Sequence, residues 1–291
     1  MAIFERGYRD LAYRPTAPFR RIWPIARHEL AAIFRIRFGT VIFIVCLAPT
    51  IGSLIFLLAS AGIWETEPRM RERMAGFDPS LPSFFLRPIT SALGFLPFLV
   101  LTTLVSARAI AKDRAAGALE IYWTRAITPL GYFVGKVLGS FLLLATVFVV
   151  APFVLWLTSV LIAPDWGQFE ATIGFLPGML LGLTVHAAAM AALAVGVSAL
   201  ASTPNMASIA WLFVVVGTGF VGQVLRRMLA EPWVALISPW SAAARVVDWF
   251  AGWTPVVSYP PAAAGVALAA ALAAVLGLAA RRLRVLEAVA T

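Results

Sequence analysis

Few side chains in this sequence could carry out chemistry on a substrate. There are two histidines, His28 and His186, and one cysteine, Cys46. The histidines lack the spacing of a helical metal site, and no nucleophile elbow occurs. A single cysteine in an apolar stretch is typical of a small buried side chain and supports neither a disulfide nor a metal site. The pattern predicts no enzyme active site, metal site or bound cofactor on this chain.

The segment from Gly131 to Lys136 superficially resembles a phosphate-binding loop. The Walker pattern requires four residues between its glycines and a Ser or Thr after its Lys to bind Mg²⁺. Here three residues separate Gly131 from Gly135, and Val137 follows Lys136. Any ATP and Mg²⁺ would therefore have to be bound by a separate polypeptide.

His186 and Gln223 are the main strongly polar side chains within otherwise apolar stretches. A polar group in a membrane span is a candidate for a translocation path, although His186 could equally hydrogen-bond a neighbouring helix. No Asp, Glu, Lys or Arg lies centrally in any predicted span, whereas ion-coupled carriers usually need buried acids there. This weakens the case for ion coupling and favours a transporter whose energy is supplied from outside the membrane domain. The alternative is an ATP-independent secondary carrier or a membrane scaffold.

The polar segment 108–131 follows the second predicted span. Its charged residues are Arg108, Lys112, Asp113, Arg114, Glu120 and Arg125. We expect a short cytoplasmic helix here, broken by Pro129, with Leu119, Ile121 and Trp123 available for a buried contact. The alternative is a solvated loop with ordinary charge beside the membrane.

This segment resembles the one between spans two and three in permease subunits of type-two ABC exporters. The matching elements, in order, are Asp113-Arg114, Gly117, Leu119-Glu120, Pro129 and Gly135-Lys136. Two departures occur: Ile121-Tyr122-Trp123 replaces the usual bulky apolar pair, and Leu130-Gly131 stands where a polar-Arg pair is common.

The resemblance implies a coupling helix that docks on a separate ATPase subunit. The residues it assigns to this contact are Asp113, Arg114, Gly117, Leu119, Glu120, Trp123, Arg125 and Pro129. It also implies a dimer, with itself or with a sister permease, bound to two ABC ATPase subunits that carry the ATP and Mg²⁺. Spans one, two and five would form the walls of the pathway.

The composition predicts an all-α integral membrane protein. Of 291 residues, 61% are hydrophobic and only 13% are charged, far from the balance of a soluble domain. The charges fall in clusters between apolar runs long enough to cross a bilayer. The transmembrane domain, 39–280, has six predicted spans at 39–63, 88–107, 137–162, 176–201, 206–225 and 262–280.

Three further segments flank these spans. Residues 1–38 form a cytoplasmic tail that includes an amphipathic helix over 22–37, either interfacial or part of a soluble tail. Residues 65–87 are charged and rich in proline, which predicts an exposed loop. Residues 228–254 carry four tryptophans and three charges and predict an interfacial or re-entrant segment before the last span.

The distribution of basic residues predicts the topology. Segments 1–37, 108–136 and 281–284 hold 16 of the 23 Lys and Arg residues, which favours cytoplasmic termini, including a tail at 281–291. The expected location is a bacterial inner membrane. The net charge of +9 flanks apolar spans, which indicates contact with the lipid bilayer and not with nucleic acid.

Small residues recur at every fourth position in three predicted spans. The sets are Gly174, Gly178 and Gly182; Ala188, Ala192 and Gly196; and Gly265, Ala269, Ala273 and Gly277. This spacing allows close approach of helices in lipid, within one bundle or at a dimer interface.

Overall fold

The computed structural model describes residues 18–60, 78–90, 92–123, 127–253 and 260–290. Within these ranges every regular element is a helix. Six helices are long and apolar enough to cross a membrane, as the sequence predicted. They run over Arg37–Ser60, Gly94–Ala115, Pro129–Leu161, Leu176–Leu200, Pro204–Leu229 and Pro261–Val285.

The first, fourth and sixth of these correspond to α2 (Arg37–Ser60), α11 (Leu176–Leu200) and α15 (Pro261–Ala290). The second comprises α5 (Ala92–Leu104) and α6 (Ala109–Ala115), joined by a tight turn. The third comprises α8 (Pro129–Ala145), the π-helical turn η3 (Thr146–Val150) and α9 (Ala151–Leu161). The fifth comprises α12 (Pro204–Leu212), the π-helical turn η4 (Phe213–Gly217) and α13 (Thr218–Leu229).

Two of these helices begin with the same local signal. Thr128 precedes Pro129, and its hydroxyl accepts a hydrogen bond from the N–H of Gly131 at 3.1 Å. Thr203 precedes Pro204 and accepts from the N–H of Met206 at 3.3 Å. A Thr cap followed by Pro satisfies one free N–H and presets the helical φ. α11 ends at Leu200 and α12 begins at Pro204, so a tight turn joins the fourth and fifth of these helices.

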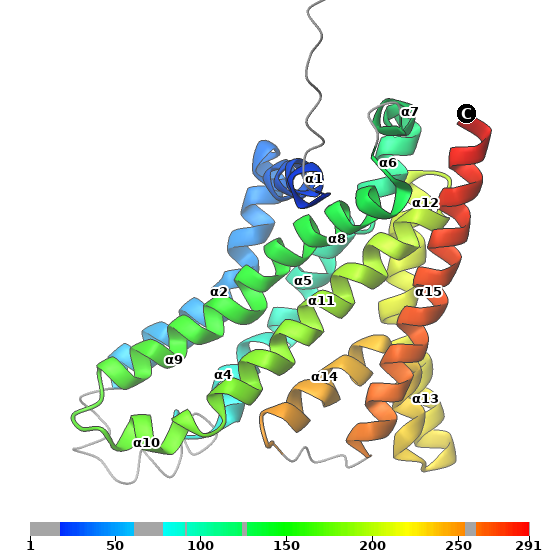
Figure 1. Ribbon diagram of the computed structural model, residues 1–291. Helices are drawn as coiled ribbons and strands as arrows, with labels where there is room; N and C mark the ends of the chain where they lie inside the picture. The colour runs from blue at the N-terminus through cyan, green and yellow to red at the C-terminus, as the bar shows by residue number, and fades with distance from the viewer. Residues whose placement is uncertain (1–17, 61–77, 91, 124–126, 254–259, 291) are drawn as a thin grey trace, which may run out of the picture.

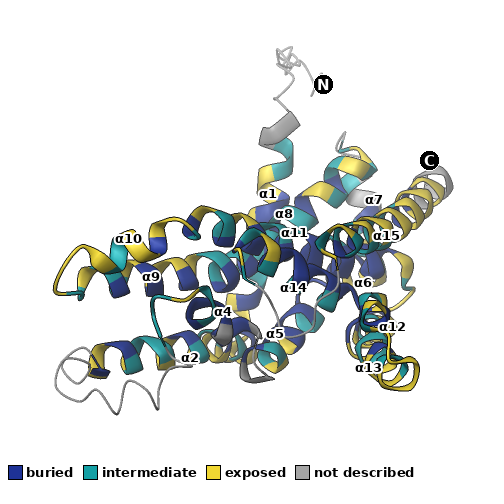
Figure 2. Cartoon of the chain, turned by 90° about the horizontal axis from the view of Figure 1, so that it is seen from below, coloured by how far each residue is buried: buried dark blue, intermediate teal, exposed yellow. Residues whose placement is uncertain are grey.

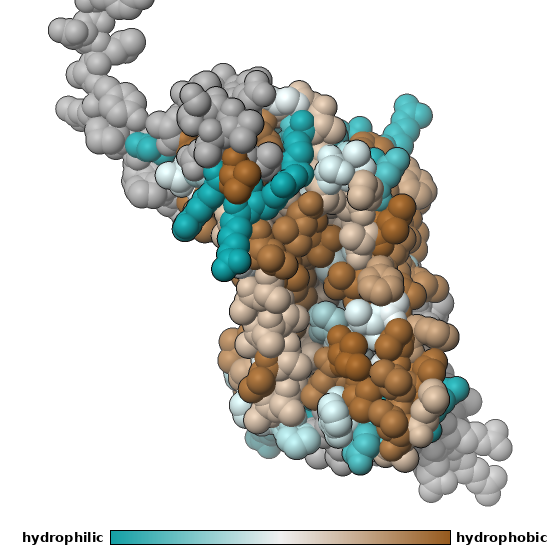
Figure 3. All heavy atoms as spheres, turned by 90° about the vertical axis from the view of Figure 1, so that its right-hand side faces the viewer, coloured by the Kyte–Doolittle hydropathy of each residue, from teal (hydrophilic) through white to brown (hydrophobic). Residues whose placement is uncertain are grey.

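The centre of the bundle is α11, whose residues are largely buried, whereas few residues of α2, the α12–α13 helix and α15 are buried (Figures 1 and 2). Figure 3 shows the face formed by α12, α13 and α15. Apolar side chains cover much of it, and hydrophilic ones gather toward the end at which α15 terminates. Such faces are stable only against lipid or another apolar surface.

The amphipathic N-terminal segment forms α1 (Pro18–Ala32) and a short 3₁₀ turn, η1 (Ile33–Arg35), instead of one helix to residue 37. Ile36 is extended, with φ −110° and ψ 118°, so the chain turns there before α2 begins. Figure 1 shows α1 crossing the end of the bundle, and its apolar face packs on α8. Ile25 and Ala26 are buried in that contact.

Glycines on α8 permit this close packing. A Cβ on Gly135 would lie 2.9 Å from the Cβ of Ile25. A Cβ on Gly139 would lie 2.6 Å from both the carbonyl oxygen of Ala26 and the Cβ of Glu29. The same device joins α11 to α14 (Pro239–Phe250), where Gly178 and Gly182 face the α14 backbone. Part of the small-residue repeat therefore serves packing within one chain.

The expectation that residues 65–87 form an exposed loop is wrong for its last part. Residues Pro82–Thr90 form α4, and Phe84, Phe85 and Leu86 are buried. The ring of Phe85 packs against Phe175, with centroids 5.9 Å apart. Proline at the first position and near the end of α4 is compatible with a short helix, and three consecutive apolar residues supply its buried face. The predicted start of span two, at residue 88, lies within α4.

The segment before the last span contains η5 (Pro232–Ile237), a 3₁₀ helix, and α14. Figure 1 shows that α14 lies in the half of the bundle opposite α1, between α11 and α15. The 3₁₀ helix packs back along α13, since Gly222 lies close to the backbone of Val234 and Ala235. Burial raises the pKa of the Asp248 carboxyl on α14 to about 6, although Arg245 one turn earlier opposes the shift.

Candidate functional site

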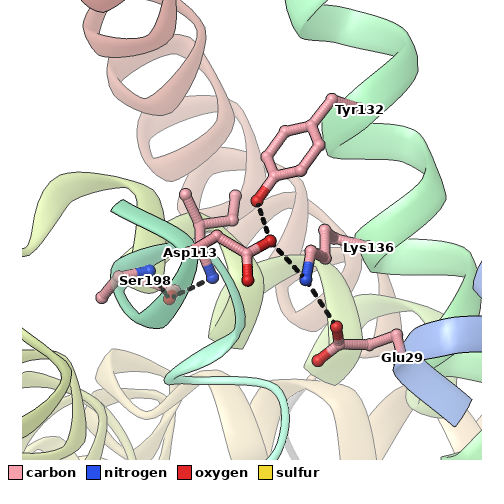
Figure 4. A network of polar contacts seen from close by, with 7 residues as sticks. Glu29, Asp113, Tyr132, Lys136 and Ser198 are labelled. Carbon is pink, nitrogen blue, oxygen red and sulfur yellow. Dashed lines mark hydrogen bonds and ion pairs between the residues drawn. The ribbon is translucent and has the colours of Figure 1, made fainter. Parts of the chain in front are cut away.

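A buried ionic network lies at the end of the bundle where α1, α6 and α8 meet (Figure 4). The ammonium group of Lys136 on α8 lies 2.7 Å from Glu29 Oε2 on α1 and 2.8 Å from Asp113 Oδ2 on α6. The Tyr132 hydroxyl donates to the same Asp113 oxygen at 2.7 Å. The side chains of Lys136 and Glu29 are only 3% and 6% exposed. One lysine thus joins two carboxylates from helices that are distant in sequence.

Because the network is buried, its two carboxylates depend on Lys136. Moving an ion out of water costs several kcal/mol, which short charge-assisted contacts on every side offset. Lys136 has two such contacts, and Asp113 has a second donor in Tyr132. The loss of Lys136 would leave two carboxylates close together without a cation, so this one side chain holds the three helices in one relative position.

A second set of contacts fixes α6 to the end of α11. The Ser198 hydroxyl accepts hydrogen bonds from the N–H groups of Ile110 and Ala111, both at 3.0 Å. Arg114 donates to the carbonyl oxygens of Ala199 and Ala201 at 2.8 Å and 2.6 Å. The first N–H groups of a helix and the last carbonyls of another have no partner within their own helix. Here Ser198 on α11 accepts from two such N–H groups of α6, and Arg114 on α6 donates to two such carbonyls at the end of α11.

Ser198→Ala is expected to destabilise the folded chain by about 1–3 kcal/mol, because two buried N–H groups lose the hydroxyl that accepts from them. The midpoint of unfolding in detergent micelles measures this. Ser140→Ala is the matched control, since Ser140 is equally buried and its hydroxyl has no partner among the described residues. Its removal should change stability by less than about 1 kcal/mol. Equal effects of the two substitutions would contradict the bridging role of Ser198.

Beyond α6 the chain turns sharply into α7 (Ala118–Trp123). Gly117 has φ +68°, the left-handed conformation that glycine adopts without strain, and its N–H donates to the Arg114 carbonyl at 3.0 Å. Ala115, Ala116 and Gly117 are exposed at this turn. The α6–α7 hairpin therefore presents its turn outward at the end of the bundle (Figure 1).

Several residues assigned to a partner contact point into the chain instead. Asp113 and Arg114 are engaged as described above, and Leu119 is buried beside Ile110 and Tyr132. Pro129 begins α8. The side chains of Glu120 and Trp123, and the whole of Arg125, lie outside the described residues. Of the assigned set with described side chains, Gly117 is the one that is exposed at the hairpin turn.

Sequence reasoning missed Glu29, Tyr132 and Ser198 as members of this site. Glu29 carried a usable signal, because it is the only acid among the five arginines of residues 18–37. An isolated charge of opposite sign on an apolar helix face indicates a buried ion pair. Tyr132 and Ser198 have no such signal, since each lies in an ordinary apolar helical pattern.

The two polar candidates within spans have different surroundings. His186 is buried, stacks on Phe148 with centroids 5.0 Å apart, and meets the Trp240 ring edge-on at 4.7 Å. Trp240 belongs to α14. His186 thus joins α11 to α14. Gln223 is exposed on the outer face of α13.

Compared with known proteins, the sequence matches no protein-family model and no curated protein.

Proposed function

We propose that this chain is the membrane-spanning permease subunit of an ATP-driven ABC exporter. The observation that carries the proposal is the α6–α7 hairpin. Its turn is exposed, and α6 is held by contacts that link it to α1, α8 and α11. Asp113 ties α6 to α8 through Lys136, Glu29 ties α1 into the same network, and Ser198 ties α6 to α11. A force applied at the turn would be transmitted to all three together.

The partner in this proposal is a separate ABC ATPase subunit that binds ATP and Mg²⁺. Closure of two such subunits would push on residues 108–129 and rearrange the helices of the permease. The spans themselves contain few groups that could couple transport to an ion gradient: no Asp, Glu, Lys or Arg occurs between Glu170 and Arg226. The energy would then come from the cytoplasmic side, in the inner membrane of a bacterium, with both termini on that side.

The proposal includes a dimer of this chain or of this chain with a sister permease. Apolar side chains on α2, α12–α13 and α15 remain exposed within one chain. On α15, the small residues Ala269, Ala273 and Gly277 face outward, and a Cβ on Gly277 would meet nothing within 4 Å. These surfaces are available to lipid or to a second subunit. The re-entrant placement of η5 and α14 from the outer side of the membrane belongs to the same proposal.

Affinity purification from the native membrane in mild detergent tests the assignment. We expect a nucleotide-binding subunit in stoichiometric amount with the wild-type chain. Ala116→Arg places a bulky charge at the exposed turn, where it should not disturb the fold but should reduce recovery of the ATPase by about tenfold or more, as at a contact worth more than about 1.4 kcal/mol. ATPase activity of the eluate measures the same loss.

Asn205→Arg provides the matched control, because Asn205 is exposed at the start of α12 at the same end of the bundle. It adds the same charge without altering the hairpin, and we expect full recovery of the ATPase. Purification of the wild-type chain without any ATPase in several mild detergents would overturn the exporter proposal and favour an ATP-independent carrier or a scaffold.

A further inference from the structure

A cavity of about 300 Å³ opens beside the ionic network, between α1, the start of α2, the end of α5, and α6. Its charged lining comes from Glu29, Arg108, Lys112, Asp113 and Lys136. Its apolar lining includes Ile33, Ile36, Phe38 and Leu104. The volume is in the range of small-molecule sites, and the mixture of walls indicates an amphipathic occupant.

The two carboxylates in this cavity are already neutralised in part. Lys136 lies within 2.8 Å of both Glu29 and Asp113, and Tyr132 donates to Asp113. Arg108 and Lys112, by contrast, form no ion pair with any residue that the structure describes. The cavity therefore presents two cationic side chains, Arg108 and Lys112, that can bind an anion. The two carboxylates beside them are already paired with Lys136.

The apolar side of the cavity is open to the surroundings of the bundle. Ile36 and Phe38 are 55% and 58% exposed, at the point where the chain enters α2. The first apolar span begins at Arg37, so this level corresponds to the boundary between headgroups and acyl chains. A free inorganic anion would gain nothing from these side chains, whereas a lipid would place its acyl chains against them.

We propose that this cavity binds the phosphate headgroup of an anionic phospholipid. Arg108 and Lys112 contact the phosphate, and the acyl chains run along Ile36 and Phe38. The site goes beyond the exporter proposal and does not depend on it. Because the same cavity contains Glu29, Asp113 and Lys136, the lipid would rest against the joint that holds α1, α6 and α8 together and stabilise that arrangement.

The purified full-length chain in mild detergent tests the site, with thermal unfolding followed while lipid is added. Phosphatidylglycerol should raise the unfolding temperature, whereas phosphatidylcholine with the same acyl chains and soluble glycerol phosphate should not. Arg108→Gln with Lys112→Gln should weaken the apparent affinity for phosphatidylglycerol by about thirtyfold, as expected for the loss of two cations near the headgroups. Lys112→Gln alone, at an exposed position, should weaken it by about fivefold.

The matched control is Arg226→Gln with Arg227→Gln, which removes two cations at the last turn of α13. We expect this variant to respond to phosphatidylglycerol as the wild type does. An equal response of the Arg108 and Lys112 variants and the wild type would overturn the site. A full response to glycerol phosphate would also overturn it, in favour of a site for soluble phosphate.

Discussion

Lys136→Met is expected to destabilise the folded chain by about 3–5 kcal/mol, the cost typical of breaking a buried ion pair by removing one partner. Met fills a similar volume, so the effect would come from the charge. Glu29 and Asp113 would be left near each other without the cation that now lies between them. The midpoint of unfolding in mixed detergent micelles, followed by the fluorescence of the ten tryptophans, measures the loss.

A triple variant separates the charge from the shape of the site. Glu29→Gln and Asp113→Asn, added to Lys136→Met, remove both carboxylates and keep polar groups that can hydrogen-bond. Replacing a complete buried ionic cluster by neutral residues is often close to neutral in stability. We therefore expect the triple variant to recover most of the stability lost in Lys136→Met. A triple variant as unstable as the single one would show that the network does not work through compensated charge.

The general architecture of the chain could be predicted from its sequence because lipid imposes simple rules. A helix that crosses a bilayer must be apolar along its whole length, so the charge-free runs locate the six spans. Helix starts such as Thr128-Pro129 and Thr203-Pro204 are local signals and were also accessible. The break at Ile36 could not be predicted, because it depends on how α1 packs on α8.

The contacts within the candidate site could not be predicted in the same way. Glu29 and Lys136 are 107 residues apart, and nothing in either local sequence specifies the other. Gly135-Lys136 was recognised only as part of a motif, whereas the structure shows that Gly135 makes room for α1 and that Lys136 binds its glutamate. Asp113 was assigned to a partner contact through the motif resemblance. Its burial arises from tertiary packing alone.

Gly139→Leu is expected to destabilise the chain by about 3 kcal/mol or more, at the upper end of the usual cost of overpacking. A Cβ at this position would lie 2.6 Å from the Ala26 carbonyl oxygen, and backbone cannot move aside as a flexible side chain can. The leucine would therefore force α1 away from α8. Unfolding in mixed micelles again provides the measurement. Because Glu29 moves with α1, the displacement should also break its contact with Lys136.

Gly52→Leu is the matched control for this substitution, since Gly52 also lies within an apolar helix and a Cβ there would meet nothing within 4 Å. Leucine is intrinsically favoured over glycine in a helix by about 0.8 kcal/mol, so this variant should be neutral or slightly more stable. Glu29→Gln combined with Gly139→Leu should cost less than the two changes added together, by about 0.5–3 kcal/mol, because each breaks the contact between Glu29 and Lys136. Strict additivity would mean that the packing of α1 on α8 and the ionic network are energetically independent. The hairpin could not then transmit a displacement to α1.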